Sequence, residues 1–353
     1  MSASKRALVA MSGGVDSAMT AYLIKQAGYR ALGVTMRLHG GGENGCCTEQ
    51  DMADAAAVAA MLHIPHEVCE LSSRFSEAVI APFIEAYETG RTPNPCVLCN
   101  RYLKFEALYD YGRAHGYDTI ATGHYARIRY DEASGRYLLL RAADPTKDQS
   151  YVLYSLRQEQ LAHTLFPLGE MTKDEVRAKA EQLGFLNARK RDSQDICFVP
   201  DGDYARFIEE YTGKTYPPGD FVTADGRVLG RHRGLIRYTI GQRKGLGLAL
   251  PAPLYVCALD LPGNRVLLGE ERDLYTKTLL AKDINLITAA RWDVPQRLSA
   301  RVRYRQKEQP ATVTQIDEDT LRVEFDEPQR AVTRGQAVVL YDGDVVAGGG
   351  VIA

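Results

Sequence analysis

Short apolar runs alternate with amphipathic runs over the first third of the chain, and this alternation constrains the fold more than any other feature. Ala7–Met11 and Ala31–Met36 are predicted to be buried strands, and Asp16–Ala27, which ends at Gly28, is predicted to be the helix between them. Strands joined through helices build a parallel sheet covered on both faces, so the sequence predicts an α/β fold with a doubly wound parallel sheet. Further strands are predicted at 66–71 and 119–121, and further helices at 49–62, 74–88, 101–114 and from the Thr172–Glu175 capping box to Gly184.

The pattern changes after about residue 200, where short segments rich in Gly and Pro favour a small β-rich domain. From about Thr276 the chain is predicted to form the short, evenly spaced strands of a small barrel. The last strand is interrupted by Asp342-Gly343, a strong hairpin signal. The predicted strands lie at 297–305, 311–316, 321–325 and 337–346. We therefore predict three domains: a doubly wound domain at 1–200, a small β-rich central domain at 201–275 and a C-terminal β-barrel at 276–353.

Composition and charge exclude several classes of protein. The chain is 45% hydrophobic and 25% charged, and its formal net charge of -2 gives no global cationic field of the kind that marks many nucleic-acid binders. Apolar runs are far shorter than the roughly 18 residues that span a bilayer, and the first is too short for a signal peptide. Seven cysteines, an odd number, argue against a disulfide framework. We expect a cytoplasmic protein with no membrane partner, whose thiols serve chemistry or bind metal.

A glycine-rich turn joins the first predicted strand to the first predicted helix. In Ser12-Gly-Gly-Val-Asp-Ser17, backbone N–H groups and a helix N-terminus can converge on an anion. The turn lacks the Gly-Lys-Ser/Thr of the Walker loop, with no lysine placed for β- and γ-phosphates, and it lacks the three glycines of the dinucleotide fingerprint. The alternative is a tight turn that uses glycine only for backbone freedom. The run resembles the pyrophosphate-binding loop of the N-type ATP pyrophosphatases, which cleave ATP between the α- and β-phosphates.

Three of the cysteines stand in polar loops. Cys96 and Cys99 follow two prolines and directly precede the helix predicted from Arg101, and Cys197 follows a basic triplet. A helix N-terminus favours thiolate, the nucleophilic form, and Arg101 and Lys104 would add to this effect. One alternative is that these cysteines are small buried hydrophobic residues. Another is that Cys96 and Cys99 form half of a zinc site, although no second pair completes one.

Six motifs in order make the sequence recognisable: SGGVDS, NPCVLCN, ATGHYA at 121–126, KDQSYVL at 147–153, DSQDICF and YTIGQRKGLG at 238–247. With these motifs nearly the whole chain resembles the bacterial tRNA-specific 2-thiouridylase family of the ATP pyrophosphatase (PP-loop) superfamily. The resemblance implies a fold like that of the adenine nucleotide alpha hydrolases. It also implies 2-thiolation of the wobble uridine in tRNAs for Lys, Glu and Gln. ATP would adenylate the C2 oxygen, giving AMP and pyrophosphate, and sulfur would arrive as a cysteine persulfide.

The resemblance also implies roles for individual residues. Cys99 would be the nucleophile and Cys197 the persulfide carrier, and a disulfide would form between them during turnover. A sulfur-relay protein or a cysteine desulfurase would supply the persulfide sulfur. ATP, with Mg²⁺, would be bound by Ala10, Met11, Ser12, Gly13, Gly14, Val15, Asp16, Ser17, Met36 and Gly123. The tRNA would be contacted by Asn94, Pro95 and Cys96 at the target base, and elsewhere by His124, Lys147, Asp148, Gln149, Arg303, Tyr304 and Gln336.

One departure from the family pattern keeps a second chemistry open. Many relatives have Asp where this chain has Cys96, so Cys96, Cys99 and Cys197 could instead hold three irons of a four-iron cluster. We favour the persulfide relay and assign no metal ligand otherwise. Two further alternatives are another ATP pyrophosphatase that acts on a different substrate and a non-catalytic RNA-binding protein with a decayed nucleotide site.

Local basic patches are expected to bind RNA, because the net charge is close to zero. Arg301, Arg303 and Arg305 alternate with other residues, which would place three guanidinium groups on one face of a strand, although a solvated outer face is the alternative. His232 has no assignable role. A second basic patch is expected between residues 230 and 250, a stretch without acidic residues. It consists of Arg231, Arg233, Arg237, Arg243 and Lys244.

Overall fold

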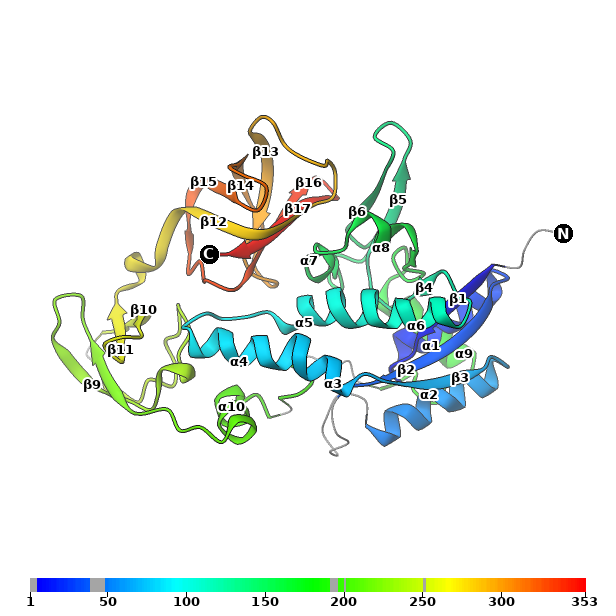
Figure 1. Ribbon diagram of the computed structural model, residues 1–353, viewed down its shortest axis with the longest axis horizontal. Coiled ribbons are helices and arrows are strands. Elements are labelled where there is room, and N and C mark those ends of the chain that lie inside the picture. Colours follow the sequence, from blue (N-terminus) through cyan, green and yellow to red (C-terminus); the bar gives the residue numbers. More distant parts are fainter. Residues whose placement is uncertain (1–4, 39–47, 191–195, 200, 250–251) are drawn as a thin grey trace.

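The computed structural model describes residues 5–38, 48–190, 196–199, 201–249 and 252–353. Three sheets form within these residues. Figure 1 shows the first sheet and the central domain at opposite ends of the long axis, with the C-terminal barrel lying against the helices that run between them. None of the helices in the described part of the chain is long and apolar enough to cross a membrane.

The first sheet is parallel and has five strands in the order β3-β2-β1-β4-β7. Alternate residues of β1 enter two separate cores: Ala7 and Val9 pack with one set of helices, and Leu8 packs with the other. Covered faces on both sides confirm the doubly wound α/β prediction. The strands are β1 (Arg6–Ala10), β2 (Arg30–Arg37), β3 (His66–Glu70), β4 (Ile120–Ala121) and β7 (Thr164–Leu165).

One face of this sheet is covered by three helices that agree with the sequence pattern. They are α1 (Val15–Gln26), α2 (Glu49–Met61) and α9 (Lys173–Gln182). Thr172 and Glu175 form the expected capping box at the start of α9. This agreement follows from local chemistry, because caps and apolar periodicity act within a few residues.

The opposite face is covered by two composite helices in which α-helical and π-helical (η) turns follow one another. The first comprises α3 (Ser72–Phe75), η1 (Ser76–Ile80) and α4 (Ala81–Glu88), and the second comprises α5 (Pro95–Leu98), η2 (Cys99–Ala107) and α6 (Leu108–Ala114). Asn94 caps the second helix by accepting a hydrogen bond from the Cys96 N–H at 3.2 Å. The expected start at 101 is therefore wrong, because Asn94 and Pro95 supply an earlier cap and first turn. The short helices α7 (Ser150–Leu153) and α8 (Gln158–Ala162) complete this side.

The central region is β-rich, as expected. Its four-stranded sheet has the order β10-β11-β8-β9, and α10 (Tyr204–Thr212) and the short turns η3 (Leu235–Arg237) and η4 (Glu271–Leu274) flank it. His232 is buried here: its Nε2 lies 3.1 Å from the Asn264 carbonyl, and its Nδ1 accepts from the Gly234 N–H at 3.1 Å. His232 therefore has a structural role. The strands are β8 (Gly219–Val222), β9 (Val228–His232), β10 (Tyr255–Asp260) and β11 (Arg265–Gly269).

The C-terminal region forms the expected barrel, which closes through pairing of its first and last strands. The Asp342-Gly343 hairpin is present between the last two strands. The strand expected at 297–305 ends at Arg301, so the proposal of three arginines on one strand face is wrong. The strands are β12 (Tyr275–Leu286), β13 (Gln296–Arg301), β14 (Gln309–Gln315), β15 (Leu321–Arg330), β16 (Ala337–Asp342) and β17 (Val345–Ile352).

A hairpin from the first 200 residues joins the barrel sheet. It consists of β5 (Arg127–Asp131) and β6 (Arg136–Leu140), and β6 pairs with β17 at Leu140 and Val345 (Figure 1). The sequence pattern did not predict this hairpin. It ties the barrel to the doubly wound domain beside the segment that carries Lys147 to Gln149.

Candidate active site

The glycine-rich turn lies where the strand order reverses, between the carboxyl ends of β1 and β4. Gly13 has a φ of +73°, and a Cβ atom there would lie 2.3 Å from the Asp51 carbonyl oxygen. A Cβ atom at Gly123, in the loop after β4, would lie 3.0 Å from the Asp16 carbonyl carbon. The turn thus packs against the start of α2 at Gly13, and the loop after β4 packs tightly against the start of α1 at Gly123. In doubly wound sheets this crevice is the ligand site.

Hydrogen bonds fix the shape of the turn. The Ser12 N–H donates to Ser17 Oγ at 3.1 Å, and Ser17 Oγ donates to the Gly14 carbonyl at 2.9 Å. From outside the turn, Asn187 Nδ2 donates to the Gly13 carbonyl at 3.0 Å. A turn held in this way presents its N–H groups at the start of α1 without reorganisation, as an anion site requires.

A buried lysine supplies the positive charge that the turn itself lacks. Lys173 Nζ lies 2.8 Å from both carboxylate oxygens of Asp16, and Lys173 is 6% exposed. Tyr125 donates its hydroxyl to the same carboxylate at 2.8 Å. Sequence reasoning missed this lysine because it is 157 residues from Asp16. The only local signal was its position directly after the Thr172 cap, at the carboxyl edge of the sheet.

A second lysine links the turn to the segment that leads towards Cys197. Lys190 Nζ lies 2.6 Å from Asp51, 2.7 Å from Asp54 and 3.4 Å from the Gly13 carbonyl. Burial raises the pKa of the Asp51 carboxyl, but hydrogen bonds from Lys190 and Thr48 outweigh this effect and hold the pKa below its ordinary value. Asp51 therefore stays ionised, and the ion pair anchors residue 190 beside the glycine-rich turn.

The three cysteines lie within electrostatic reach of one another. Cys96 is exposed, whereas Cys99 and Cys197 are half-buried. Desolvation by burial raises the pKa of the Cys99 thiol to about 12. The charge of Lys104 lowers this pKa, whereas the nearby Cys197 and Cys96 raise it further. Burial therefore opposes the thiolate that the sequence predicts at Cys99, and the helix begins at Pro95, so Cys99 is not at its N-terminus.

Lys104 also contacts His124, which the resemblance assigned to tRNA. Lys104 Nζ lies 3.3 Å from His124 Nε2, and Thr122 Oγ1 lies 2.7 Å from His124 Nδ1. An ammonium only donates, so Nε2 accepts and Nδ1 carries the proton. Burial, and then the charge of Lys104, lowers the pKa of His124 well below its ordinary value. His124 is therefore neutral and points towards the cation that faces the cysteines.

The barrel contributes an aromatic residue beside Cys96. Tyr304 interacts electrostatically with Cys96 and donates its hydroxyl to the Asp148 carbonyl at 3.2 Å. The Arg301 guanidinium lies 5.5 Å from the Tyr304 ring and 5.6 Å from the Tyr151 ring. The Asp148 carboxylate itself is buried and accepts from the Ala142 and Ser150 N–H groups. Cys96, Asp148 and Tyr304 thus meet where the barrel faces the second composite helix.

Two other expected tRNA contacts connect domains in this structure. Arg303 is half-buried, and one of its nitrogens lies 3.1 Å from the Ile240 carbonyl, 3.2 Å from the Ala331 carbonyl and 2.6 Å from Thr333 Oγ1. Gln336 Nε2 donates to the carbonyls of Thr92 and Pro93, at 2.8 and 3.2 Å. These two residues link the barrel to the central region at Ile240 and to the Asn94 segment. Their tRNA contacts stay predictions.

Some residues of the expected basic patch at 230–250 form ion pairs within the protein. Arg237 Nη2 lies 2.7 Å from Glu209, and Arg231 lies 3.9 Å from Asp220. Arg233, Arg243 and Lys244 are exposed. These three residues are the part of the patch that can meet phosphate.

The fold and the site together define a class. A doubly wound sheet with an anion-binding turn at its switch point, a buried lysine that contacts Asp16 of that turn and cysteines on an adjacent helix are typical of an ATP-using α/β enzyme with thiol chemistry.

Comparisons with known proteins identify the family. Residues 5–201 match the family model described as "tRNA methyl transferase HUP domain", 205–270 match "tRNA methyl transferase PRC-barrel domain" and 276–352 match "Aminomethyltransferase beta-barrel domain". The chain is 47% identical to the tRNA-specific 2-thiouridylase MnmA of Clostridioides difficile over 99% of this chain and 98% of that protein. It is 48% identical to the protein of the same name from Acetivibrio thermocellus over 99% of both chains, and 52% identical to that of Moorella thermoacetica over 98% of both. The chain belongs to the tRNA-specific 2-thiouridylase family, which confirms the resemblance drawn from the six motifs.

Proposed function

We propose that this protein is an ATP-dependent tRNA sulfurtransferase that converts the wobble uridine of tRNAs for Lys, Glu and Gln to 2-thiouridine. The observation that carries this proposal is the contact between the anion-binding turn and the segment that precedes Cys197 in the sequence. Asn187 and Lys190, which precede the Cys197 segment, both contact the Gly13 carbonyl of the anion-binding turn. Adenylation and sulfur transfer act on one carbon atom, so the segment that carries Cys197 must lie close to the ATP site when substrate is bound.

ATP would bind at the crevice between the loops after β1 and β4. The residues proposed for this are Ala10–Ser17, Met36 and Gly123, and the narrow fit at Gly13 and Gly123 supports them. We add Lys173, whose ammonium lies at the carboxylate of Asp16. Mg²⁺ would accompany the triphosphate, and Asp16 is the carboxylate that we propose to hold it. Fixed N–H groups and the lysine would stabilise the charge that develops on the leaving pyrophosphate.

Adenylation creates a leaving group at a poor electrophile. The uridine O2 attacks the α-phosphorus of ATP, the bond to the bridging oxygen breaks and pyrophosphate departs, while N3 loses its proton. The oxygen on carbon 2 is then bonded to AMP, which can leave from that carbon. His124 and Lys104 are proposed to border this position, and the neutral imidazole would not compete with Lys104 for negative charge.

Sulfur transfer then uses two thiols. The terminal sulfur of a Cys197 persulfide attacks C2 and AMP leaves. Cys99 thiolate attacks Cys197 Sγ, which breaks the sulfur–sulfur bond to the transferred atom and forms a Cys99–Cys197 disulfide. The thiolate left on C2 takes up a proton at N3, and a dithiol reductant must restore the two thiols. The persulfide would come from a sulfur-relay protein or a cysteine desulfurase.

The raised pKa of Cys99 fits this order of steps. A protonated Cys99 does not attack a persulfide before substrate is present, so sulfide is not lost to water. The charge of Lys104 favours the thiolate of Cys99. This effect would become stronger as negative charge develops on Cys99 during the reaction. We therefore propose Lys104 as a residue that helps activate Cys99.

Recognition of tRNA is proposed to involve the residues that the family match carries over, together with exposed basic residues of the central domain. Three of the carried-over residues, Cys96, Asp148 and Tyr304, lie together, which supports the assignment. The remaining ones are Asn94, Pro95, His124, Lys147, Gln149, Arg303 and Gln336.

A second candidate chemistry rests on Cys96. Three thiols within electrostatic reach of one another could hold an iron–sulfur cluster, although the described residues contain no group of three or more ligands arranged to hold a metal ion. Anaerobic purification with iron and labile-sulfide analysis, beside Cys96→Ser, separates the two chemistries. Full thiolation by iron-free protein fed with a persulfide donor supports the relay. Stoichiometric iron and sulfide, with activity lost on chelation and in Cys96→Ser, contradicts it.

A further inference from the structure

The helix that carries Cys99 has an unusual winding. Cys99–Ala107 form the π-helical segment η2, and at its end the Leu108 N–H donates to the carbonyl of Leu103, five residues earlier. The π-helix is rare in proteins and is found frequently at functional sites. The winding of η2 therefore needs a physical explanation.

The π-helical winding brings a lysine to the Cys99 thiol. In a π-helix the N–H of one residue bonds to the carbonyl five residues earlier, so these two residues lie nearly above each other. Cys99 and Lys104 are five residues apart, and the charge of Lys104 acts on the Cys99 thiol. An α-helix, with 3.6 residues per turn, would turn Lys104 about 140° away from Cys99. The winding of η2 thus places the ammonium and the thiol on one face.

An ion pair joins another face of η2 to the barrel. Arg101 Nη1 lies 2.6 Å from Asp283 Oδ2 on β12, and the Arg101 side chain is 16% exposed. Burial lowers the pKa of Arg101, but its hydrogen bond to Asp283 outweighs this effect and holds the pKa above its ordinary value. Residues two apart on a helix do not face each other, so Arg101 can hold the barrel while Cys99 faces Lys104.

The barrel presents Asp283 through a strained backbone. The φ of Asp283 is +48°, in the left-handed region that few residues other than glycine adopt. The pairing of β12 with β17 shifts in register between Lys282 and Asn285, so Asp283 lies in an irregular part of the strand. A Cβ atom at Gly348 on β17 would lie 2.5 Å from the Asn285 carbonyl oxygen, so the opposite strand leaves room for this irregularity. Strained residues of this kind cluster at functional sites.

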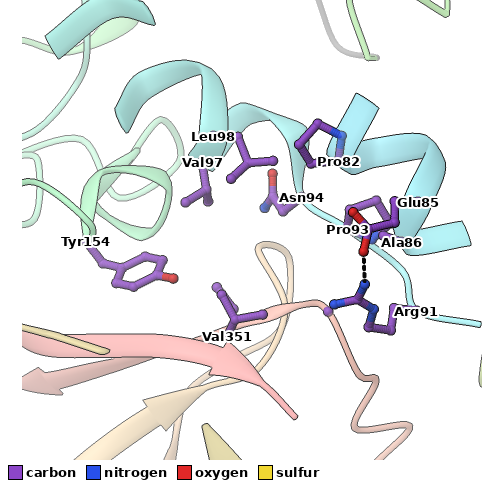
Figure 2. A pocket seen from close by; sticks show the side chains of 12 residues that line it. Pro82, Glu85, Ala86, Arg91, Pro93, Asn94, Val97, Leu98, Tyr154 and Val351 are labelled. Atoms are coloured by element: carbon purple, nitrogen blue, oxygen red, sulfur yellow. Dashed lines mark hydrogen bonds and ion pairs between the residues drawn. The ribbon is translucent and has the colours of Figure 1, made fainter. Parts of the chain in front are cut away.

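Apolar packing does not fix the start of the helix against the barrel. A cavity of about 200 Å³ lies between α5, which directly precedes Cys99, and the barrel strands. Figure 2 shows the side chains around this cavity, which include Val97, Leu98, Tyr154 and Val351. Atoms that line a void lose packing contacts on that side, so the helix can turn there more easily than in a close-packed core. The ion pair of Arg101 with Asp283 supplies the restraint that packing lacks.

We propose that Asp283 of the barrel is a positioning residue for sulfur transfer. Through Arg101 it holds the π-helical winding of η2, and this winding keeps the Lys104 ammonium at the Cys99 thiol. The inference rests on the proposed function and adds to it a residue from another domain. The barrel then takes part in the chemistry, because one of its strands sets the surroundings of the nucleophile.

The variant Asp283→Gly tests this role without a large loss of stability. It removes the carboxylate and also relieves the positive φ, so the Tm should stay within a few degrees of the wild-type value. We expect kcat for 2-thiouridine formation to fall by about three- to tenfold, with unchanged KM for ATP and for tRNA. Asp283→Asn keeps an acceptor oxygen for Arg101 and should retain more of the rate. His63→Gly is the matched control and should behave as wild type, because His63 is exposed and has a φ of +50°.

Alkylation of Cys99 by iodoacetamide separates positioning from a merely structural role. If Lys104 turns away, less thiolate is present, so Asp283→Gly should slow alkylation at a fixed, mildly alkaline pH by about three- to tenfold. A helix that only loosened would expose the thiol and react faster. In a Lys104→Met background, Asp283→Gly should cause no further loss, because changes that act through one contact are not additive.

Three results would overturn the inference. The first is an unchanged kcat with unchanged alkylation in Asp283→Gly, and the second is faster alkylation, which would make Asp283 a structural residue. The third is a raised KM for tRNA with an unchanged kcat, which would make Asp283 an RNA contact. If the wild-type protein forms no 2-thiouridine, the proposed function is wrong. The alkylation measurement needs no tRNA, so it still decides whether Asp283 acts on Cys99.

Discussion

At the scale of single residues, the chemistry of this site depends on contacts between residues far apart in the chain. The glycine turn was predictable because a strand, two glycines and a helix follow one another locally. Lys173 was not predictable, because only the packing of α9 beside α1 brings it to Asp16. The sequence predicts a lowered pKa at Cys99, whereas in the structure burial raises this pKa and outweighs the nearby charge of Lys104.

Replacement of Lys173 tests the added member of the ATP site. Lys173→Met should lower pyrophosphate release by about 100-fold, because the variant has no fixed cation beside the leaving group. Lys173→Arg should restore part of the rate. The exposed Lys179→Met on the same helix is the control and should retain wild-type turnover. Equal rates for Lys173→Met and wild type would remove this lysine from the site.

The raised pKa of Cys99 predicts a pH dependence for alkylation. Its thiol is protonated at neutral pH, so alkylation by iodoacetamide should rise about tenfold per pH unit up to pH 10 without levelling, because the pKa lies near 12. An ordinary thiol levels above its pKa of about 8.5. Site-resolved mass spectrometry checks this, with Cys99→Ser as the blank. A plateau at or below pH 8.5 contradicts the buried thiol.

At the scale of elements, local patterns predicted the strands and helices of the sheet well and its connections to other domains poorly. Caps and apolar periodicity gave α1, α2 and α9. The second composite helix starts earlier than predicted. Asn94 caps it at Pro95, whereas the apolar periodicity that indicates a helix begins only several residues later. The β5–β6 hairpin was missed, since its partner strand β17 is some 200 residues away.

The turn after β1 can be tested with two glycines that share a left-handed backbone. Gly13→Ala should abolish ATP binding, because its Cβ would overlap the Asp51 carbonyl. Gly28 also has a positive φ, but no atom lies within 4 Å of a Cβ there, so Gly28→Ala should cost only about 1–2 kcal/mol of stability and keep ATP affinity. Calorimetric titration with ATP distinguishes the two. Unchanged affinity in Gly13→Ala would show that the turn does not bind phosphate.

At the scale of the whole molecule, contacts of the barrel join the three domains. Arg303 joins the barrel to the central region at Ile240, and Gln336 joins it to the Asn94 segment. A protein with a net charge of -2 must then bind RNA through local patches. The patches were only partly predictable, because ion pairs such as Arg237 with Glu209 become visible only in the fold.

The exposed pair Arg243 and Lys244 is expected to bind phosphate groups of the tRNA. Changing both to Ala should weaken tRNA binding and flatten the plot of log affinity against log salt by about 0.7–0.9 for each phosphate that the variant no longer neutralises. Arg272→Ala, an exposed arginine paired with Glu270, serves as the control and should leave the slope unchanged. An unchanged slope in the double variant would place this part of the central domain outside the interface.

The central claim is that the glycine turn activates uridine by adenylation for sulfur transfer. The most direct measurement incubates the protein with ATP labelled at the α-phosphate, a persulfide donor, a dithiol reductant and an unmodified substrate tRNA. We predict AMP and pyrophosphate in equal amounts, formed only with tRNA and matched by one 2-thiouridine per AMP. ADP and phosphate, or AMP formed without any 2-thiouridine, would contradict the account.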